Sequence, residues 1–313
     1  MIRTVGGAFA LGMLAALLPA PAHAASDPET VCTIDDDRLK ELSGLVTTAD
    51  GYVTINDGSK KAKRRGIFYI GADCQVSRTV DFPSDPVDTE DLAVAPDGTL
   101  WVGDIGDNDT ERDTIGLWRL SPGATEPELL EARYPDGPHN AETLVLDGQA
   151  NPVIITKDPA GAEIFRFADG ALQAAGTITI PETTTGNPRD EEGRRVLTGG
   201  TNSPDGTKIA IRTYADAFVY DVTDGDVITA LTTGTPTIVP LPDEPQGEAI
   251  AFSRDGASLL TVSEDAKPDV LRYSATGDST SGSGRLWRWL AAAAGLLAVG
   301  SLAAAATLRS RRR

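Results

Sequence analysis

The sequence has little of what builds metal clusters and common catalytic centres. Among its 313 residues are only two cysteines and two histidines, and one histidine lies in the first 24 residues. Structural zinc sites use sets of four Cys and His ligands, so a fold that depends on structural zinc is disfavoured. The sequence contains no Gly-x-Ser-x-Gly elbow, P-loop or dinucleotide fingerprint, which argues against the enzyme classes that depend on them.

Basic residues are also scarce. There are 28 Lys and Arg against 46 Asp and Glu, a formal charge of −18. Seven of the basic residues are Arg3 and those from Arg285 onward, and these two ends of the chain contain no acid. The segment between them therefore carries a charge of about −25. This balance disfavours a nucleic-acid partner and favours cations or a solvated extracytoplasmic surface.

The two ends of the chain are apolar. Residues 1–24 have one Arg, a short apolar run and a small-residue cleavage site, which predicts a signal peptide. Residues 289–308 are an uncharged apolar stretch long enough to span a bilayer as a helix, and the basic tail 309–313 follows. Residues 276–288 are predicted to be a flexible tether. We therefore expect a single-pass cell-membrane protein with its N-terminal domain outside; a sortase sorting signal is the alternative, but Leu-Pro-x-Thr-Gly is absent.

Cys32 and Cys74 form an even pair in a secreted context, which predicts a disulfide that pins the N-terminal strand.

A repeat is visible when the chain is aligned on its Asp-Gly turns, which are typical of β-hairpins. The unit opens with alternating apolar residues, turns at Asp-Gly and continues into a strand that is rich in β-forming residues. It begins at Glu41, Glu90, Glu142, Gly199 and Glu248. Spacings near fifty residues suit a four-stranded blade, so residues 26–275 are predicted to be an all-β, five-bladed propeller. A sixth blade is the alternative, because the fourth unit carries the insertion 184–195.

The last repeat lacks a fourth strand, and "TVCTIDD" before the first repeat can supply it. The N-terminal strand would then close the ring, and the predicted disulfide would tie it to the first blade. No amphipathic helix is expected apart from the membrane span.

The blade openings predict an axial acidic ring, because the innermost strand of each blade lines the axis. Its predicted metal ligands are Glu41, Glu90, Glu142 and Glu248, with Thr201 or Asn202 at the equivalent place in the fourth blade. Converging glutamates repel one another unless a cation lies among them, and hard oxygen ligands suit Ca²⁺ first and Mg²⁺ second. The alternative is that each glutamate caps backbone amides without a metal.

The ends of the second strands are predicted to surround this ring. They carry Asn56, Asp57, Asp104, Asp107, Asn108, Lys157, Asp158, Arg212, Ser263 and Glu264. Lys157 and Arg212 are candidates for binding an anionic substrate group, or else are salt-bridge partners of neighbouring acids. Asp104 or Asp107 is the candidate proton acceptor, and His139 is either an acid or base beside the metal or a loop residue. The basic run 60–65 lies in a loop on the same face.

The segments "ELSGL", "EDLAV", "ETLVL", "GEAIAF" and "VGDIGDN" resemble extracytoplasmic WD40-like propellers of actinobacteria, related to the family named for the esterase-like activity of phytase. The openings also resemble the five-bladed calcium-activated nucleotidases, or apyrases. That second resemblance implies Ca²⁺ near Ser43 or Glu41, Glu90, Glu142, Thr201 or Ser203, and Glu248.

Two functions follow as hypotheses. The first is a membrane-anchored propeller with an axial divalent cation that hydrolyses a phosphate ester or phosphoanhydride. The second is a tethered, non-enzymatic binding or scaffold propeller that recognises a protein or a cell-wall glycan.

Overall fold

The computed structural model describes residues 28–241 and 244–275. The predicted signal peptide 1–24, tether 276–288, membrane span 289–308 and basic tail 309–313 lie outside the described residues. Within the described ranges, no helix has the length and apolar character needed to cross a bilayer.

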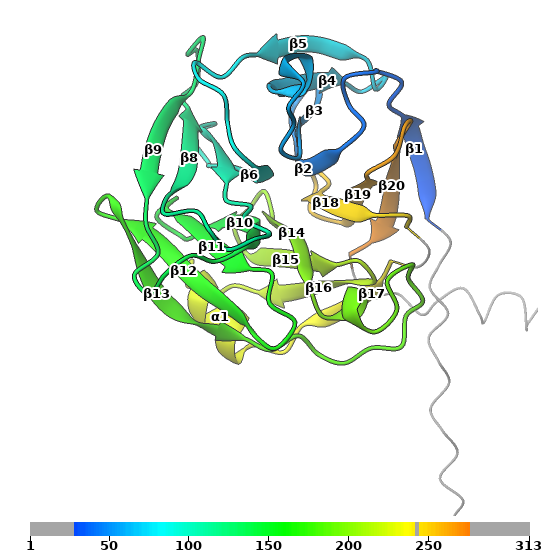
Figure 1. Ribbon diagram of the computed structural model, residues 1–313. Coiled ribbons are helices and arrows are strands. Elements are labelled where there is room, and N and C mark those ends of the chain that lie inside the picture. The colour runs from blue at the N-terminus through cyan, green and yellow to red at the C-terminus, as the bar shows by residue number, and fades with distance from the viewer. Residues whose placement is uncertain (1–27, 242–243, 276–313) are drawn as a thin grey trace, which may run out of the picture.

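Five antiparallel sheets of four strands each surround a common axis, as Figure 1 shows. The first blade holds β2 (Leu42–Thr47), β3 (Gly51–Asn56), β4 (Ile67–Gly71) and β5 (Val76–Val80). The second holds β6 (Thr89–Val94), β7 (Leu100–Asp104), β8 (Ile115–Leu120) and β9 (Glu128–Ala132). The third holds β10 (Ala141–Leu146), β11 (Pro152–Thr156), β12 (Ala162–Ala168) and β13 (Ala171–Ile178). The fourth holds β14 (Leu197–Asn202), β15 (Lys208–Thr213), β16 (Asp216–Asp221) and β17 (Thr237–Pro240).

The fifth blade closes the ring. It holds β18 (Gly247–Phe252), β19 (Ser258–Ser263), β20 (Asp269–Ser274) and, as its outermost strand, β1 (Glu29–Thr33). Pairing of β1 with β20 confirms the predicted closure by the N-terminal strand. The five-bladed prediction is confirmed and the six-bladed alternative is wrong, because insertion 184–195 contains no strand and only the 3₁₀ turn Glu192–Arg194. A second 3₁₀ turn, Ala62–Arg64, follows β3.

The hydrophobic core lies between neighbouring blades. One cluster joins Val53 of the first blade to Val102 and Trp118 of the second, and another joins Ile155 of the third to Phe218 of the fourth. The innermost strands are therefore buried on both faces, and β10 and β18 are buried at every position. A polar side chain on these strands has no solvent face available except toward the axis.

The Asp-Gly pairs form the hairpin turns that the sequence predicts. Gly98 has a φ of 86°, which an L-residue rarely adopts, and the Asp97 carboxylate accepts the Thr99 amide at 2.9 Å. The turns at Asp205 and Asp255 repeat the same contact two residues on. These acids therefore shape the turns.

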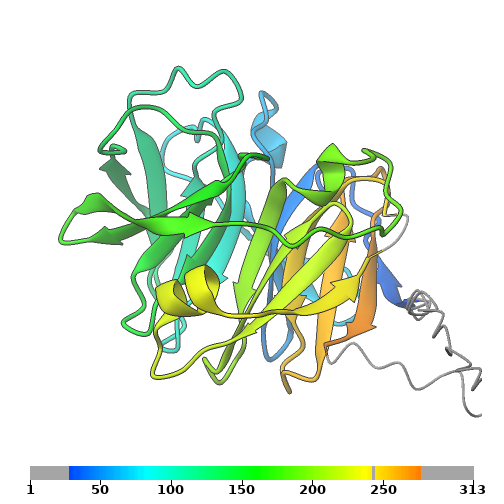
Figure 2. The ribbon, with the colours of Figure 1, turned by 90° about the horizontal axis from the view of Figure 1, so that it is seen from below.

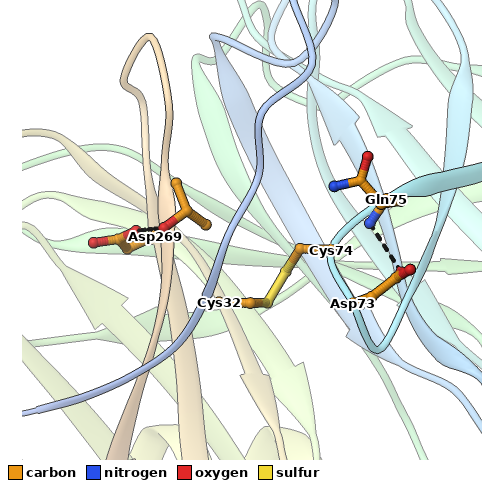
Figure 3. The surroundings of a disulfide bond; sticks show 6 residues. Cys32, Asp73, Cys74, Gln75 and Asp269 are labelled. Atoms are coloured by element: carbon orange, nitrogen blue, oxygen red, sulfur yellow. Dashed lines mark hydrogen bonds between the residues drawn. A yellow bond between two sulfur atoms is a disulfide. The ribbon is translucent and has the colours of Figure 1, made fainter.

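Cys32 and Cys74 form the predicted disulfide, shown in Figure 3. Cys32 lies on β1, and Cys74 lies in the turn between β4 and β5, so the bond joins the closing strand to the first blade. The bond thus holds the two ends of the ring together.

We expect the double variant Cys32→Ser, Cys74→Ser to fold but to lose about 2–4 kcal/mol of unfolding free energy, since the bond spans 42 residues and restrains the unfolded chain. Urea unfolding of the variant, and of the wild type with a reductant, should give the same lowered midpoint. An unchanged midpoint in both would show that strand pairing alone secures the closure.

Helix α1 (Val227–Thr233) contradicts the expectation that no helix occurs outside the membrane span. Asp226 caps it by accepting the Thr229 amide at 3.0 Å, and Val227, Ala230 and Leu231 are buried. It packs against β13 and β16 at the outer edge of the ring, as Figure 2 also shows. The helix has seven residues, five of them β-branched, and is too short for its period to be recognised in a sequence.

Candidate functional site

Each innermost strand carries a β-bulge near its start, and the bulged residue occupies the same position in every blade. The register shifts fall within Leu42–Leu45, Thr89–Asp91, Ala141–Thr143, Leu197–Gly199 and Gly247–Ala249. Aligned on the hairpin turns, the equivalent residues are Ser43, Glu90, Glu142, Thr198 and Glu248. Three of the four glutamates predicted for the ring therefore hold equivalent positions.

The register corrects the placement of Glu41. It lies two residues before the bulge, where it corresponds to Asp88, and its 41% exposed side chain pairs with Arg64 at 2.5 Å. Ser43 takes the ring position and lies 3.4 Å from Glu90.

The fourth blade also differs from the prediction. Its ring residue is Thr198, whereas Thr201 and Asn202 lie further along β14. The Asn202 amide bonds both the N–H and the C=O of Leu146, so this side chain links two blades. The alignment on "GGTNS" places the ring residue of this blade three or four positions too far along the chain, because the glycines hide the repeat.

The residues that directly follow the second strands form another layer over the ring. They are Asp57, Ile105, Lys157, Tyr214 and Glu264. The acids of this layer, together with Asp88 and the ring glutamates, form a cluster that we call the axial acidic site. It is defined by the carboxyls of Asp57, Asp88, Glu90, Glu142, Glu248 and Glu264. Carboxylate oxygens of Asp57, Asp88 and Glu90 lie within 4.8 Å of one another.

Burial and mutual repulsion dominate the electrostatics of the axial acidic site. Burial, reinforced by Asp88, raises the pKa of Asp57 to about 7, and burial with the charge of Glu248 raises the pKa of Glu142 to about 7. Burial likewise raises the pKa of Glu248 and of Glu264 to about 7 and the pKa of Glu90 well above its ordinary value. The carboxyls thus hold protons at a pH where isolated ones do not.

Lys157 is the one amine among these acids in the described part of the chain. Its Nζ lies 2.5 Å from Glu142 and donates to the Tyr214 hydroxyl at 3.0 Å, and that hydroxyl donates to Glu248 at 3.0 Å. Burial would lower the pKa of Lys157, but the carboxylates of Glu142 and Glu248 hold it above its ordinary value. Lys157 is therefore engaged as a counter-ion of the site.

Arg212 was predicted beside Lys157 as an anion-binding group, and the structure contradicts this. Its side chain is fully buried and pairs with the equally buried Glu244 at 2.9 Å. It also donates to the carbonyl of Ala249 at 3.1 Å. The alternative reading, a salt-bridge partner, describes Arg212 correctly.

The segment "VGDIGDN" builds the floor of the site. Asp104 accepts the amides of Val87 and Asp88 at 3.0 and 2.8 Å and pairs with Arg112, so it fixes the chain that carries Asp88. A Cβ at Gly106 would lie 2.1 Å from a Glu90 oxygen and 2.5 Å from an Asp88 oxygen. Only glycine leaves room for these two carboxylates.

Asp107 also serves the loop. Its oxygens accept the amides of Glu111 and Arg112 at 3.0 and 2.8 Å. Both oxygens of Asp104 and of Asp107 are thus occupied by the protein itself, which argues against either as the predicted proton acceptor.

His139 lies on the loop before β10 and contacts the third strand of its blade, away from the axis. Its nitrogens lie 3.0 Å from Asp136 and 3.4 Å from Glu163, and its ring packs on Tyr134 and Phe165. These contacts describe a loop residue that joins neighbouring elements. In the basic run 60–65, Arg64 and Arg65 pair with Glu41 and Asp85.

Three residues in or beside the site are not predicted by the sequence patterns. Asp88 lies two residues before a predicted ligand, Tyr214 directly follows a second strand, and Asp91 is fully buried on β6. Asp91 accepts the amides of Leu144 and Gly200 at 2.9 and 3.0 Å, so it joins three innermost strands below the ring. Asp88 could have been found from its position two residues before the bulged residue. The role of Asp91 could not, because its partners lie on other blades and meet it only in the closed ring.

The donor set of the axial acidic site fits a hard divalent cation. Its ligands are carboxylate oxygens, as Ca²⁺ and Mg²⁺ prefer. A second observation is independent of the clustering: the Oε2 atom of Glu248 is buried and has no hydrogen-bond partner among the described residues, and Glu248 is only 4% exposed. A buried acceptor of this kind normally has a partner.

The fold and this site define the protein as a five-bladed β-propeller with an acidic axial centre. No protein-family model matches the sequence, and no curated protein matches it. Among solved structures it is similar to a gluconolactonase from Xanthomonas campestris, with 13% identity and a TM-score of 0.43 over 82% of this chain and 99% of that one. It is also similar to a streptogramin B lyase, with 14% identity and a TM-score of 0.38 over 75% of this chain and 66% of that one. Likeness at this level carries no inference about activity, and the resemblances to the phytase-related and apyrase families stay predictions.

Proposed function

We propose that this protein is a membrane-anchored, extracytoplasmic propeller that binds one divalent cation, Ca²⁺ in preference to Mg²⁺, in the axial acidic site. The observation that carries the proposal is the buried, unpartnered Oε2 of Glu248 among converging carboxyls. The anchoring and the location rest on the composition of residues 1–24 and 289–308.

Asp57, Asp88 and Glu90 are the proposed principal ligands, because their oxygens are the closest set. Glu248 is proposed as a further ligand through its unpartnered oxygen, while Glu142 remains paired with Lys157. The cation would neutralise these carboxylates and polarise any oxygen bound to it. The residues of this chain supply the cradle: Asp104 positions Asp88, and Gly106 admits the carboxylates.

The carboxyl pKa values predict how cation binding depends on pH. Several of them are raised to about 7, so the folded protein keeps protons that the unfolded chain releases near pH 4. Without a cation, stability should therefore fall as the pH rises from about 4 to about 7. A cation must displace the protons, so its affinity should rise through the same window.

Calorimetric titration of Ca²⁺ into the purified, chelator-treated protein tests this proposal. We expect one tight site at pH 8, an affinity lower by at least about tenfold at pH 5.5, and proton release at pH 6.5 seen as a dependence on buffer ionisation enthalpy. Mg²⁺ should bind more weakly. Absence of saturable binding at pH 8 would refute the cation site.

We propose hydrolysis of a phosphate ester or phosphoanhydride as the enzymatic form of this function. Lys157 and Tyr214 support it, since both border the acidic site. The scaffold alternative is supported by Asp104, Asp107 and Arg212, which are held by the protein itself. Release of phosphate from a panel of esters and nucleotides in the presence of Ca²⁺ distinguishes the two forms, and no release across the panel favours the scaffold.

A further inference from the structure

Insertion 184–195 of the fourth blade carries an arginine to the edge of the axial acidic site. The Arg189 guanidinium carbon lies 4.5 Å from the centre of the Tyr214 ring. Tyr214 is only 2% exposed, and its hydroxyl joins Lys157 to Glu248. Arg189 therefore covers the residue that borders the acidic carboxyls.

Hydrogen bonds to buried and neighbouring side chains hold this loop in place. Thr183 and Thr185 donate to the two oxygens of Asp216 at 2.5 and 2.7 Å, and Asp216 is fully buried. The Arg189 amide donates to the Asn187 side chain at 2.8 Å. These contacts fix the backbone that leads up to the stacked guanidinium.

Arg189 itself is exposed, and no carboxylate of the described residues lies within ion-pair distance of it. Arg195 in the same insertion is instead paired with Glu191. Stacking on an aromatic ring orients the planar guanidinium and leaves its N–H groups available at the edge. That arrangement suits bidentate binding of a phosphate or a carboxylate.

We propose that Arg189 binds the oxyanion of a small-molecule ligand whose other oxygens complete the coordination of the axial cation. This inference rests on the proposed cation site. Without the cation, the carboxylates of Asp57, Asp88 and Glu90 repel an anion, so oxyanion binding must depend on the cation. Arg189 then decides which ligands bind, a role that nothing in the repeat pattern of the sequence indicates.

Calorimetry on the full-length protein tests the inference with two probes, phenyl phosphate and phenylacetate, each with and without Ca²⁺. The wild type should bind at least one probe, and only with Ca²⁺ present. Arg189→Gln should weaken that probe about 10- to 100-fold, the range for a hydrogen bond to a charged group. Arg189→Lys should fall between the two, since lysine lacks the bidentate fork.

Two readouts separate this site from a general loss of structure. Ca²⁺ affinity should stay within about twofold of the wild type in Arg189→Gln, because stacked Arg189 is not a proposed ligand of the cation. Arg195→Gln is the matched control from the same insertion and should bind both Ca²⁺ and probe as the wild type does.

The outcomes that overturn the inference differ from those that overturn the cation site. If the wild type binds Ca²⁺ but neither probe, or if Arg189→Gln binds the probe as the wild type does, the inference is wrong and the cation site stands. Probe binding that is equally strong without Ca²⁺ also overturns it. If the wild type binds no Ca²⁺, the proposed function fails and the bridging ligand fails with it.

Discussion

Replacing Glu90 and Glu248 together by glutamine is expected to lower Ca²⁺ affinity at least about 100-fold, since each lost charged ligand is worth roughly a factor of ten or more. Both side chains are buried, at 4% exposure each, so water cannot take over their role without cost. Calcium titration of the double variant at pH 8 measures the loss.

The same variant should be more heat-stable than the wild type when no cation is present at pH 8. Burial and the charge of Glu142 raise the pKa of Glu90, which shows that ionising it is unfavourable in the folded protein. A glutamine removes that penalty. Glu128→Gln, on the outer strand β9 with a 61% exposed side chain, is the control and should change neither property.

This experiment also separates a cation site from a set of backbone caps. If the glutamates only capped backbone amides, their replacement would destabilise the protein and leave no Ca²⁺ binding to lose. A destabilised variant with wild-type Ca²⁺ affinity would therefore contradict the proposed function.

Glu244→Gln is expected to cost about 3–5 kcal/mol of unfolding free energy, because it leaves the charge of Arg212 buried without an anionic partner. Both side chains are essentially inaccessible, at 0% and 1% exposure. The space for this pair is made by Gly247, where a Cβ would lie 1.8 Å from the Arg212 guanidinium. Urea unfolding measures the effect.

A double-mutant cycle sharpens this prediction. Arg212→Met alone should be similarly costly, since Glu244 would lose its cationic partner and keep the bonds from Thr261 and Tyr273. The double variant Arg212→Met, Glu244→Gln should cost much less than the sum of the two. Lys208 lies on the same strand β15 as Arg212, and Lys208→Met, which breaks its exposed pair with Asp221 of β16, should cost less than about 1 kcal/mol. Additive effects in the cycle would show that the buried pair contributes no coupling.

The structure gives Arg212 a different role from the one that its position in the sequence predicts. In the sequence, Arg212 and Lys157 look alike, since each is a cation near the end of a second strand. In the structure, Lys157 directly follows its strand and reaches the axis, whereas Arg212 lies one residue before the last position of β15 and points into the space between two blades. Arg212 therefore lies within its strand and contacts the neighbouring blade, whereas Lys157 lies beyond the end of its strand.

The sequence by itself determined the architecture. The Asp-Gly turns, the alternating strands and the spacing near fifty residues specify local hairpins, and five such units with an unpaired first strand lead to a closed ring and the Cys32–Cys74 bond. Glu90, Glu142 and Glu248 were predicted together for the same reason, since repeated local structure places equivalent residues at equivalent positions.

Only the tertiary structure decided which acids share the centre. The bulge of the first blade begins at Ser43, two residues after Glu41, so Ser43 takes the ring position, and Asp88 enters the site from two residues upstream of Glu90. The pairing of Arg212 with Glu244 and the stacking of Arg189 on Tyr214 join residues that no local pattern connects. Side-chain contacts between blades form only when the ring closes. Their energies depend on how deeply each side chain is buried, and burial cannot be read from the order of residues.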